Sequence, residues 1–226
     1  MKALLFDMDG VLVDVSASYR LAIARTVEHF AGTGLSAAQI QSYKDAGGFN
    51  NDWELTRQAL RDLGVELTLE EVMPVFQRLY LGRNFDGLIR NERWLLRAEV
   101  ATRLGSSYAL GVVTGRPRPE AEWTLQHAGM RSLFGTVVTM DDLPPQRQKP
   151  HPDGLRLAME QLGAKEGWYV GDTIDDMTAA RRAQLWPIGV IGGLNHHERM
   201  ARGALLSRHG AVAVIDDVNR VEEVLA

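Results

Sequence analysis

The chain has 226 residues, of which 45% are hydrophobic and 24% charged, so it is large enough for one hydrophobic core and a smaller lobe. Its net charge of -4 and the even spread of its 25 lysines and arginines argue against nucleic acid as a partner. The sequence has no cysteine, no apolar run long enough to span a membrane and no signal-peptide pattern, so we expect a cytoplasmic protein with no membrane partner.

Short apolar runs alternate with helical stretches along most of the chain. This pattern is typical of a parallel sheet with helices on both faces, so we expect an α/β fold with a doubly wound core. The predicted strands are residues 3–6, 108–113, 136–139, 168–170, 187–191 and 212–215.

The connection between the first two predicted strands is unusually long. About ninety residues lie there, where a few are normal, so this segment needs a structure of its own. Helical patterns cover residues 16–31, 36–45, 52–63 and 68–81, with Ser36 and Thr68 as expected N-caps. We therefore expect an α-helical cap domain at residues 15–86, inserted into a core made of residues 1–14 and 87–226.

Two carboxylates follow the first predicted strand. Asp7 and Asp9 are one residue apart and leave the same face, while Phe6 and Met8 can stay in the core. Two anions this close repel each other unless a cation or a shared proton offsets them. A functional site therefore explains the pair better than a simple carboxylate-capped turn does.

Polar residues also follow the next three strands of the predicted core. In open α/β sheets, ligands bind at the carboxyl ends of the strands, so these side chains should converge on Asp7 and Asp9. Taken singly, each fits a turn or a solvated charge, but convergence favours a site. The segments are Thr114-Gly115-Arg116, Gln148-Lys149-Pro150 and Gly171-Asp172-Thr173-Ile174-Asp175-Asp176.

The four segments, in this order, resemble the signature of the haloacid dehalogenase superfamily. The matching patterns are Asp-x-Asp-Gly after the first strand, a Thr after the second, Lys-Pro before a helix, and Gly-Asp-Thr-x-x-Asp after the fourth strand. The resemblance spans the whole core, and the insertion resembles the helical type-one cap of that family. It implies a Rossmann-like fold and phosphoryl transfer through the protein.

The resemblance also implies a role for each site residue. Asp7 is the expected nucleophile, which becomes an aspartyl-phosphate, and Asp9 is the expected general acid and base. Thr114 and the main-chain amide of Gly115 would hold the phosphoryl oxygens. Lys149 would neutralise charge on Asp7 and on the phosphate.

Mg²⁺ is the cofactor that this chemistry implies. It prefers oxygen ligands and usually keeps several waters, so Asp7, Asp172 and the main-chain carbonyl of Asp9 would suffice. Asp176 would orient metal-bound waters or Lys149 from behind these ligands.

Two further places bear on the substrate. Arg116 could clamp a second anionic group, or it could be a surface charge. In the predicted cap, Asn51, Asp52 and Trp53 follow a pair of glycines and could face the core site and select the substrate. The alternative for that loop is an interhelical turn with Asp52 as N-cap.

The leading interpretation is Mg²⁺-dependent hydrolysis of a small phosphorylated metabolite. A phosphosugar mutase uses the same core and is the main enzymatic rival, and a phosphoryl-accepting binding or switch module is the alternative from another class. Phosphonate hydrolysis needs a Schiff-base lysine from the cap, where Lys44 is the sole lysine. The particular metabolite and the oligomeric state stay open.

Overall fold

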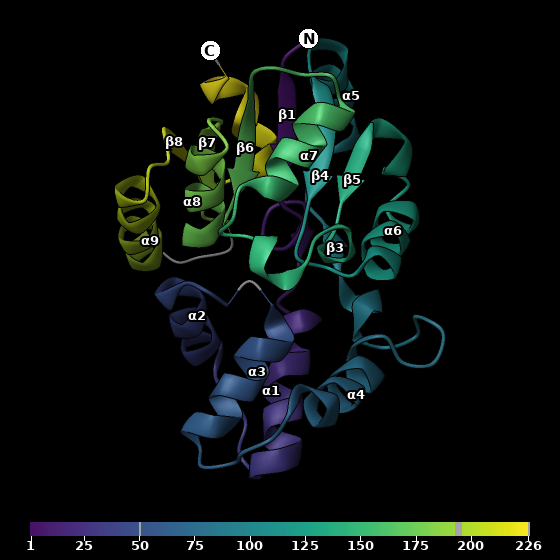
Figure 1. The fold of residues 1–226 in the computed structure, drawn as a ribbon, viewed down its shortest axis with the longest axis vertical. Helices are drawn as coiled ribbons and strands as arrows, with labels where there is room; N and C mark the ends of the chain where they lie inside the picture. The colour runs from purple at the N-terminus through teal and green to yellow at the C-terminus, as the bar shows by residue number, and fades with distance from the viewer. Residues whose placement is uncertain (50, 193–195, 226) are drawn as a thin grey trace. The chain divides into compact units, whose positions relative to one another are not determined.

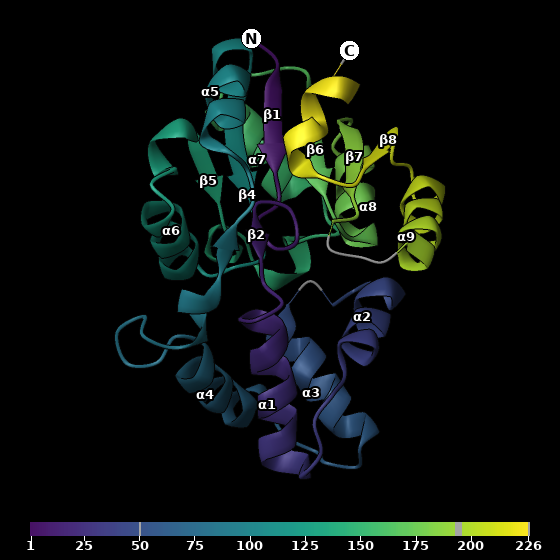
Figure 2. The ribbon, with the colours of Figure 1, turned by 180° about the vertical axis from the view of Figure 1, so that it is seen from behind.

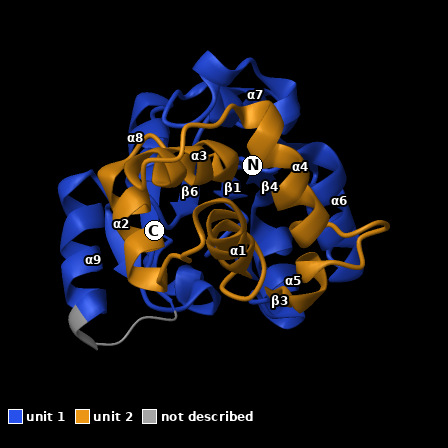
Figure 3. Cartoon of the chain, turned by 90° about the horizontal axis from the view of Figure 1, so that it is seen from below, with its two compact units in different colours: residues 1–13, 94–226 blue, residues 14–93 orange. Residues whose placement is uncertain are grey.

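The computed structural model describes residues 1–49, 51–192 and 196–225. The chain forms two compact units, shown in Figure 3: residues 1–13 with 94–226 make unit 1, and residues 14–93 make unit 2. Unit 2 runs past the expected end of the inserted segment at residue 86 and stops at Arg93. Within the described ranges, no helix is both long and apolar enough to cross a membrane.

Unit 1 is built on a sheet of six parallel strands in the order β5-β4-β1-β6-β7-β8. The strands are β1 (Ala3–Phe6), β4 (Ala109–Val113), β5 (Thr136–Val138), β6 (Gly167–Gly171), β7 (Trp186–Val190) and β8 (Ala213–Ile215). Each predicted strand forms, because apolar runs of this length between turn residues suit a strand buried on both faces. The expected doubly wound α/β fold is confirmed.

The strand order reverses direction across β1. Its four residues are fully buried, and its last residue, Phe6, pairs with Val112 of β4 and Val170 of β6. In a doubly wound sheet, ligands bind where the order reverses, at the carboxyl ends of the strands. The ends of β1, β4 and β6 are therefore the expected place for a site.

Helices cover both faces of the sheet, with α7 and α8 on one face and α5 on the other (Figures 1 and 2). Leu5 and Tyr169 of the sheet pack into one buried cluster with Leu155 of α7 and Ala179 of α8. The helices of unit 1 are α5 (Ala98–Ser107), α6 (Arg118–His127), α7 (Asp153–Gln161), α8 (Ile174–Arg182) and α9 (His196–Arg208). Short 3₁₀ helices are η2 (Arg131–Leu133), η3 (Met140–Asp142), η4 (Pro145–Arg147) and η5 (Val218–Val224).

Unit 2 is helical. Its elements are α1 (Tyr19–Ala31), α2 (Ala37–Ala46), α3 (Asp52–Asp62), α4 (Leu69–Tyr80) and the 3₁₀ helix η1 (Leu88–Asn91). Ser36 and Thr68 form capping boxes at α2 and α4, as their sequences predict. Helix α1 begins three residues later than expected, because Asp14 accepts a hydrogen bond from the Ser16 amide in the turn before it.

The chain passes between the units through a pair of short strands. β2 (Val13–Asp14) carries the chain into unit 2, and β3 (Arg93–Trp94) carries it back. The two strands form a sheet of their own, so both crossings lie side by side.

Candidate active site

The loop after β1 places Asp7 at the floor of the site. The Asp7 amide donates to the Val170 carbonyl of β6 at 2.8 Å, and its side chain is buried. Gly10 has φ +76°, and a Cβ there would lie 2.3 Å from the Asp172 Oδ2. A glycine is therefore required for two reasons, because the backbone is left-handed and the Asp172 carboxylate packs against it.

Lys149 lies between two carboxylates. Its Nζ is 2.9 Å from Asp7 Oδ1 and 2.7 Å from Asp176 Oδ1, and its side chain is almost completely buried. The lysine reaches this position from the segment before α7, more than a hundred residues after Asp7 in the chain. The structure thus brings together two residues that the sequence could only place at the same edge of the sheet.

Asp176 is the fully buried partner of this lysine. One of its oxygens, Oδ1, accepts from Lys149. The other, Oδ2, accepts from the amides of Asp172 and Thr173 at 3.1 and 3.0 Å. With Thr173 it also forms the capping box that begins α8. Both oxygens are engaged by protein donors, so Asp176 is placed to orient Lys149 and the Asp172 loop.

The charges in this cluster shift each other's protonation. Burial raises the pKa of Asp7, and although Lys149 opposes this, nearby acids led by Asp176 leave the pKa well above its usual value. Burial disfavours the charged lysine, but Asp176 and Asp7 outweigh that effect and raise the Lys149 pKa. Burial also raises the pKa of Asp176, yet Lys149 and Thr173 lower it overall. The site therefore has more negative charge than its one lysine can offset.

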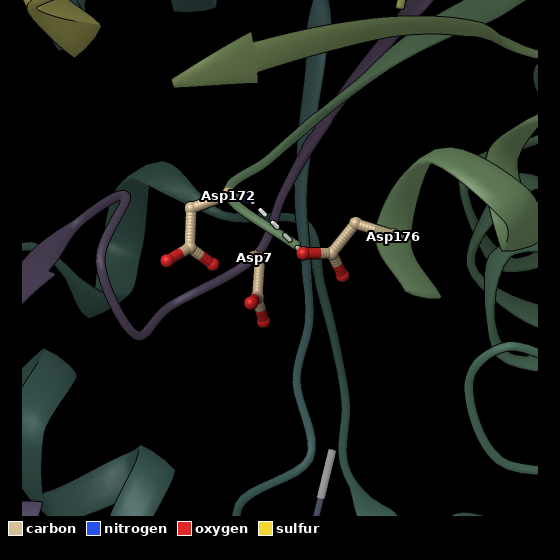
Figure 4. A group of neighbouring side chains, drawn as sticks. All are labelled: Asp7, Asp172 and Asp176. Atoms are coloured by element: carbon tan, nitrogen blue, oxygen red, sulfur yellow. Dashed lines mark hydrogen bonds between the residues drawn. The ribbon is translucent and has the colours of Figure 1, made fainter. Parts of the chain in front are cut away.

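A divalent cation fits this excess of negative charge. Carboxylate oxygens of Asp7, Asp172 and Asp176 lie within 4.8 Å of one another (Figure 4). Asp7 and Asp172 supply the hard oxygen ligands that Mg²⁺ prefers, while the Asp176 oxygens already accept hydrogen bonds. The residues present fit a metal held by Asp7 and Asp172. The expected use of the Asp9 carbonyl stays a prediction.

Thr114 and Gly115 follow β4. The Thr114 amide donates to the Val138 carbonyl at 2.9 Å, which extends the sheet pairing by one residue. Its buried hydroxyl accepts from the Arg116 amide at 3.2 Å and still has its own proton to donate. This arrangement suits a group that binds a phosphoryl oxygen, as the resemblance implies.

Arg116 is not a surface charge, which was one of the two alternatives for it. It is 1% exposed, and its Nε and Nη2 donate to the Oδ1 of Asp9 at 2.8 and 2.5 Å. Its Nη1 donates to Thr124 of α6 at 2.8 Å. Asp9 keeps 30% of its side chain exposed, so the guanidinium lies behind the carboxylate.

Two residues of the site, Tyr169 and Arg202, were not identified from the sequence. The hydroxyl of Tyr169 in β6 contacts Lys149, and Arg202 of α9 donates to the main-chain carbonyl of Asp172 at 2.5 Å. Tyr169 lies in an apolar strand and is typical of a core residue there. A buried tyrosine hydroxyl usually has a hydrogen-bond partner, and this rule could have indicated that Tyr169 contacts a polar group. Arg202 lies in no motif.

The cap residues singled out in the sequence organise their own loop. Asn51, not Asp52, is the N-cap of α3, and its side chain accepts from the Trp53 amide at 2.9 Å. Asp52 forms an ion pair with Lys44, whose Nζ also donates to the Phe49 carbonyl. A role of this loop in substrate selection stays a prediction.

The acids that follow β1 and β6, the threonine that follows β4 and the buried lysine before α7 belong to a parallel α/β core with a helical insertion. The family model of haloacid dehalogenase-like hydrolases matches residues 1–184, and the chain belongs to this family. It is therefore an enzyme, and its relatives support a phosphoric monoester hydrolase.

Several known proteins are similar to the chain. An imidazoleglycerol-phosphate dehydratase of Phytophthora nicotianae is 36% identical over 230 residues, which cover 95% of this chain, and the chain spans half the length of that relative. The phosphoglycolate phosphatase of Escherichia coli K12 is 27% identical over 216 residues, covering 88% of this chain and 84% of the relative.

Solved structures share the fold. A protein of Haemophilus somnus assigned as a phosphoglycolate phosphatase has a TM-score of 0.77 at 23% identity, covering 99% of this chain and 97% of the other. A protein of Thermotoga maritima assigned as a beta-phosphoglucomutase has a TM-score of 0.69 at 24% identity, with full coverage of both chains.

Proposed function

We propose that this protein is an Mg²⁺-dependent phosphatase that hydrolyses a small phosphorylated metabolite through an aspartyl-phosphate on Asp7. The observation that carries the proposal is the buried ion pair between Asp7 and Lys149, 2.9 Å long, beside the Asp172 carboxylate. A carboxylate can attack a phosphate monoester when the site offsets the charge of both anions.

The reaction divides into two displacements at phosphorus. In the first, an Asp7 oxygen forms a bond to phosphorus while the bond to the leaving oxygen breaks, and Asp9 gives that oxygen a proton. In the second, Asp9 takes a proton from a water that attacks phosphorus, and Asp7 is released with inorganic phosphate. Thr114 and Lys149 hold the phosphoryl oxygens. A bound Mg²⁺ supplies charge neutralisation at Asp7 and Asp172.

In this proposal Arg116 positions Asp9 and does not clamp the substrate. Its guanidinium is buried and already donates to Asp9 and Thr124, which supports a role in holding the Asp9 carboxylate in place. Removing one member of a buried ion pair leaves the other without its partner, so the pair should matter for the proton transfers at Asp9.

The relatives favour particular substrates for a first screen. Phosphoglycolate follows from the 27% identical phosphatase, and phosphorylated imidazole alcohols follow from the 36% identical dehydratase. The fold shared with an assigned beta-phosphoglucomutase keeps a phosphosugar mutase as the second candidate. Phosphonate hydrolysis is disfavoured, because Lys44, the candidate Schiff-base lysine, forms an ion pair with Asp52.

The test is turnover by the purified protein. With Mg²⁺ it should release inorganic phosphate from 4-nitrophenyl phosphate and, faster, from some members of a phosphorylated metabolite panel. Asp7→Asn should reduce kcat by at least about a thousandfold, because no carboxylate remains to attack phosphorus. Asp62→Asn, at an exposed carboxylate of α3, is the control and should leave kcat unchanged. Turnover retained by the Asp7 variant would exclude the covalent route.

Product analysis separates the phosphatase from the mutase. A phosphatase releases phosphate and incorporates oxygen from labelled water into it, whereas a mutase returns an isomeric phosphosugar without net release of phosphate. An isomer as the main product from a hexose phosphate would overturn the proposed hydrolysis.

A further inference from the structure

The Tyr169 hydroxyl is a buried group at the site to which the mechanism assigns no role. Tyr169 is fully buried in β6, and its oxygen lies 2.9 Å from Lys149 Nζ. We propose that Tyr169 is a positioning residue that aims the Lys149 ammonium at Asp7. The proposal deepens the proposed function, on which it rests for the role of Lys149.

The donors of Lys149 can be counted. An ammonium group has three N–H bonds and no acceptor. Three oxygens surround it, namely Oδ1 of Asp7 at 2.9 Å, Oδ1 of Asp176 at 2.7 Å and the Tyr169 hydroxyl at 2.9 Å. Hydrogen bonds to the Tyr169 hydroxyl and to the Asp176 Oδ1 hold the ammonium in place. They keep its charge 2.9 Å from the Asp7 Oδ1, where the phosphoryl group must arrive.

The hydroxyl proton of Tyr169 also has hydrogen-bond acceptors. Because Lys149 can only donate, the tyrosine oxygen accepts from it and sends its own proton elsewhere. The Val113 carbonyl lies 3.0 Å away and the Asp176 Oδ1 lies 3.1 Å away. Val113 ends β4 and directly precedes Thr114, the expected phosphate-binding residue. One hydroxyl thus joins the lysine to the strand end that carries Thr114.

Loss of this hydroxyl has a specific consequence. Tyr169→Phe keeps the ring that packs in the core but removes one of the two hydrogen bonds that hold the buried Lys149 ammonium. The ammonium can then rotate about its bond to Asp176, so it spends less time directed at Asp7. Small displacements of a catalytic group are costly, and we expect kcat to fall about 10- to 100-fold while KM changes much less.

A matched control is available in unit 2. Tyr80 is also fully buried, and its hydroxyl donates to a carboxylate oxygen of Glu92 at 2.8 Å. Tyr80→Phe therefore also removes a buried hydroxyl, with its hydrogen bond to Glu92, and lies away from Lys149 in the chain. Both variants should lower Tm, but kcat should fall in the Tyr169 variant alone. Equal activity of Tyr169→Phe and wild type, or equal losses in both variants, would overturn the proposal.

NMR of the lysine ammonium groups gives a readout that does not depend on turnover. The chain has four lysines, Lys2, Lys44, Lys149 and Lys165, so the ¹⁵N ammonium spectrum is simple to assign with Lys149→Arg. In the wild type the Lys149 signal should be visible and slow to exchange with water, because the ammonium is buried and donates to Tyr169 and Asp176. In Tyr169→Phe it should broaden or vanish, and in Tyr80→Phe it should persist.

Each outcome has a clear meaning. If Tyr169→Phe does not fold, the wild-type spectrum still decides, because a Lys149 ammonium that exchanges as fast as an exposed lysine would contradict its buried, hydrogen-bonded position. If the Lys149 signal is unchanged in a folded Tyr169→Phe, the proposal is wrong even where activity falls. If Asp7→Asn stays active, the covalent mechanism fails separately, whatever the lysine spectrum shows.

Discussion

At the scale of single residues, the site is a buried cluster in which acids and a lysine shift each other's protonation. Asp7 lies near three other acids, and the lysine beside it does not bring its pKa back to the usual range. Burial and like charges together favour the neutral acid, yet a nucleophile must be ionised. A divalent cation bound between Asp7 and Asp172 would resolve this conflict.

The buried arginine behind Asp9 leads to a prediction about leaving groups. Arg116→Lys keeps a positive charge but cannot donate from two positions to one oxygen, so Asp9 should be held less firmly. We expect kcat/KM to fall about tenfold or more for alkyl phosphates, whose leaving oxygen needs a proton. It should fall less for 4-nitrophenyl phosphate, whose leaving group needs none.

Steady-state kinetics on a series of leaving groups measures this difference. Arg118→Lys is the matched control, because Arg118 also pairs with a carboxylate, that of Asp142, but is 41% exposed. It should leave both substrates unaffected. A rise in KM at unchanged kcat in the Arg116 variant would instead indicate that the guanidinium binds the substrate.

At the scale of elements, most of the fold could be predicted from the sequence and part of the site could not. Apolar runs and capping residues such as Ser36 and Thr68 are local signals, so strands and helices follow from them. The motifs place Asp7 and Lys149 at the same carboxyl edge of the sheet, after β1 and between β5 and α7. The burial of Arg116 and the hydroxyl contact of Tyr169 depend on which side chains meet in three dimensions, and no local pattern records that.

The loop after β1 allows a prediction about a single methyl group. Gly10→Ala would put a Cβ 2.3 Å from the Asp172 Oδ2 at a residue with φ +76°, so it should displace the carboxylate. We expect Mg²⁺ affinity, measured by calorimetry, and kcat each to fall about tenfold or more, as supports of metal ligands typically show.

The control for Gly10→Ala separates the steric clash with Asp172 from the strain of an alanine at positive φ. Gly129 has φ +68° and nothing within 4 Å of a built Cβ, so Gly129→Ala carries the same backbone strain without the collision. It should lower Tm but keep the Mg²⁺ affinity. Similar Mg²⁺ affinities in the two alanine variants would show that the Asp172 carboxylate tolerates the added methyl group.

At the scale of the whole molecule, metal binding should be visible as stability. A ligand that binds the folded state at about 100 times its Kd adds roughly 2.7 kcal/mol to the free energy of unfolding. For a chain of this size we expect Mg²⁺ to raise Tm by about 5–10 °C and EDTA to reverse the rise and abolish turnover.

Differential scanning calorimetry of two variants tests where the metal binds. Asp172→Asn should lose most of the Mg²⁺-dependent shift, because one of the two carboxylates expected to bind the metal is gone. Asp62→Asn, in unit 2, should keep it. A full shift in Asp172→Asn would place the ion elsewhere.

The paired strands β2 and β3 make the helical insertion modular. Because the chain leaves and re-enters unit 1 at neighbouring points, a short turn from Val13 to Trp94 would close the sheet core without a long unstructured linker. Recombination could therefore replace everything in between and leave the phosphate chemistry intact. A scaffold with this property can acquire new substrates by exchange of one continuous piece of sequence.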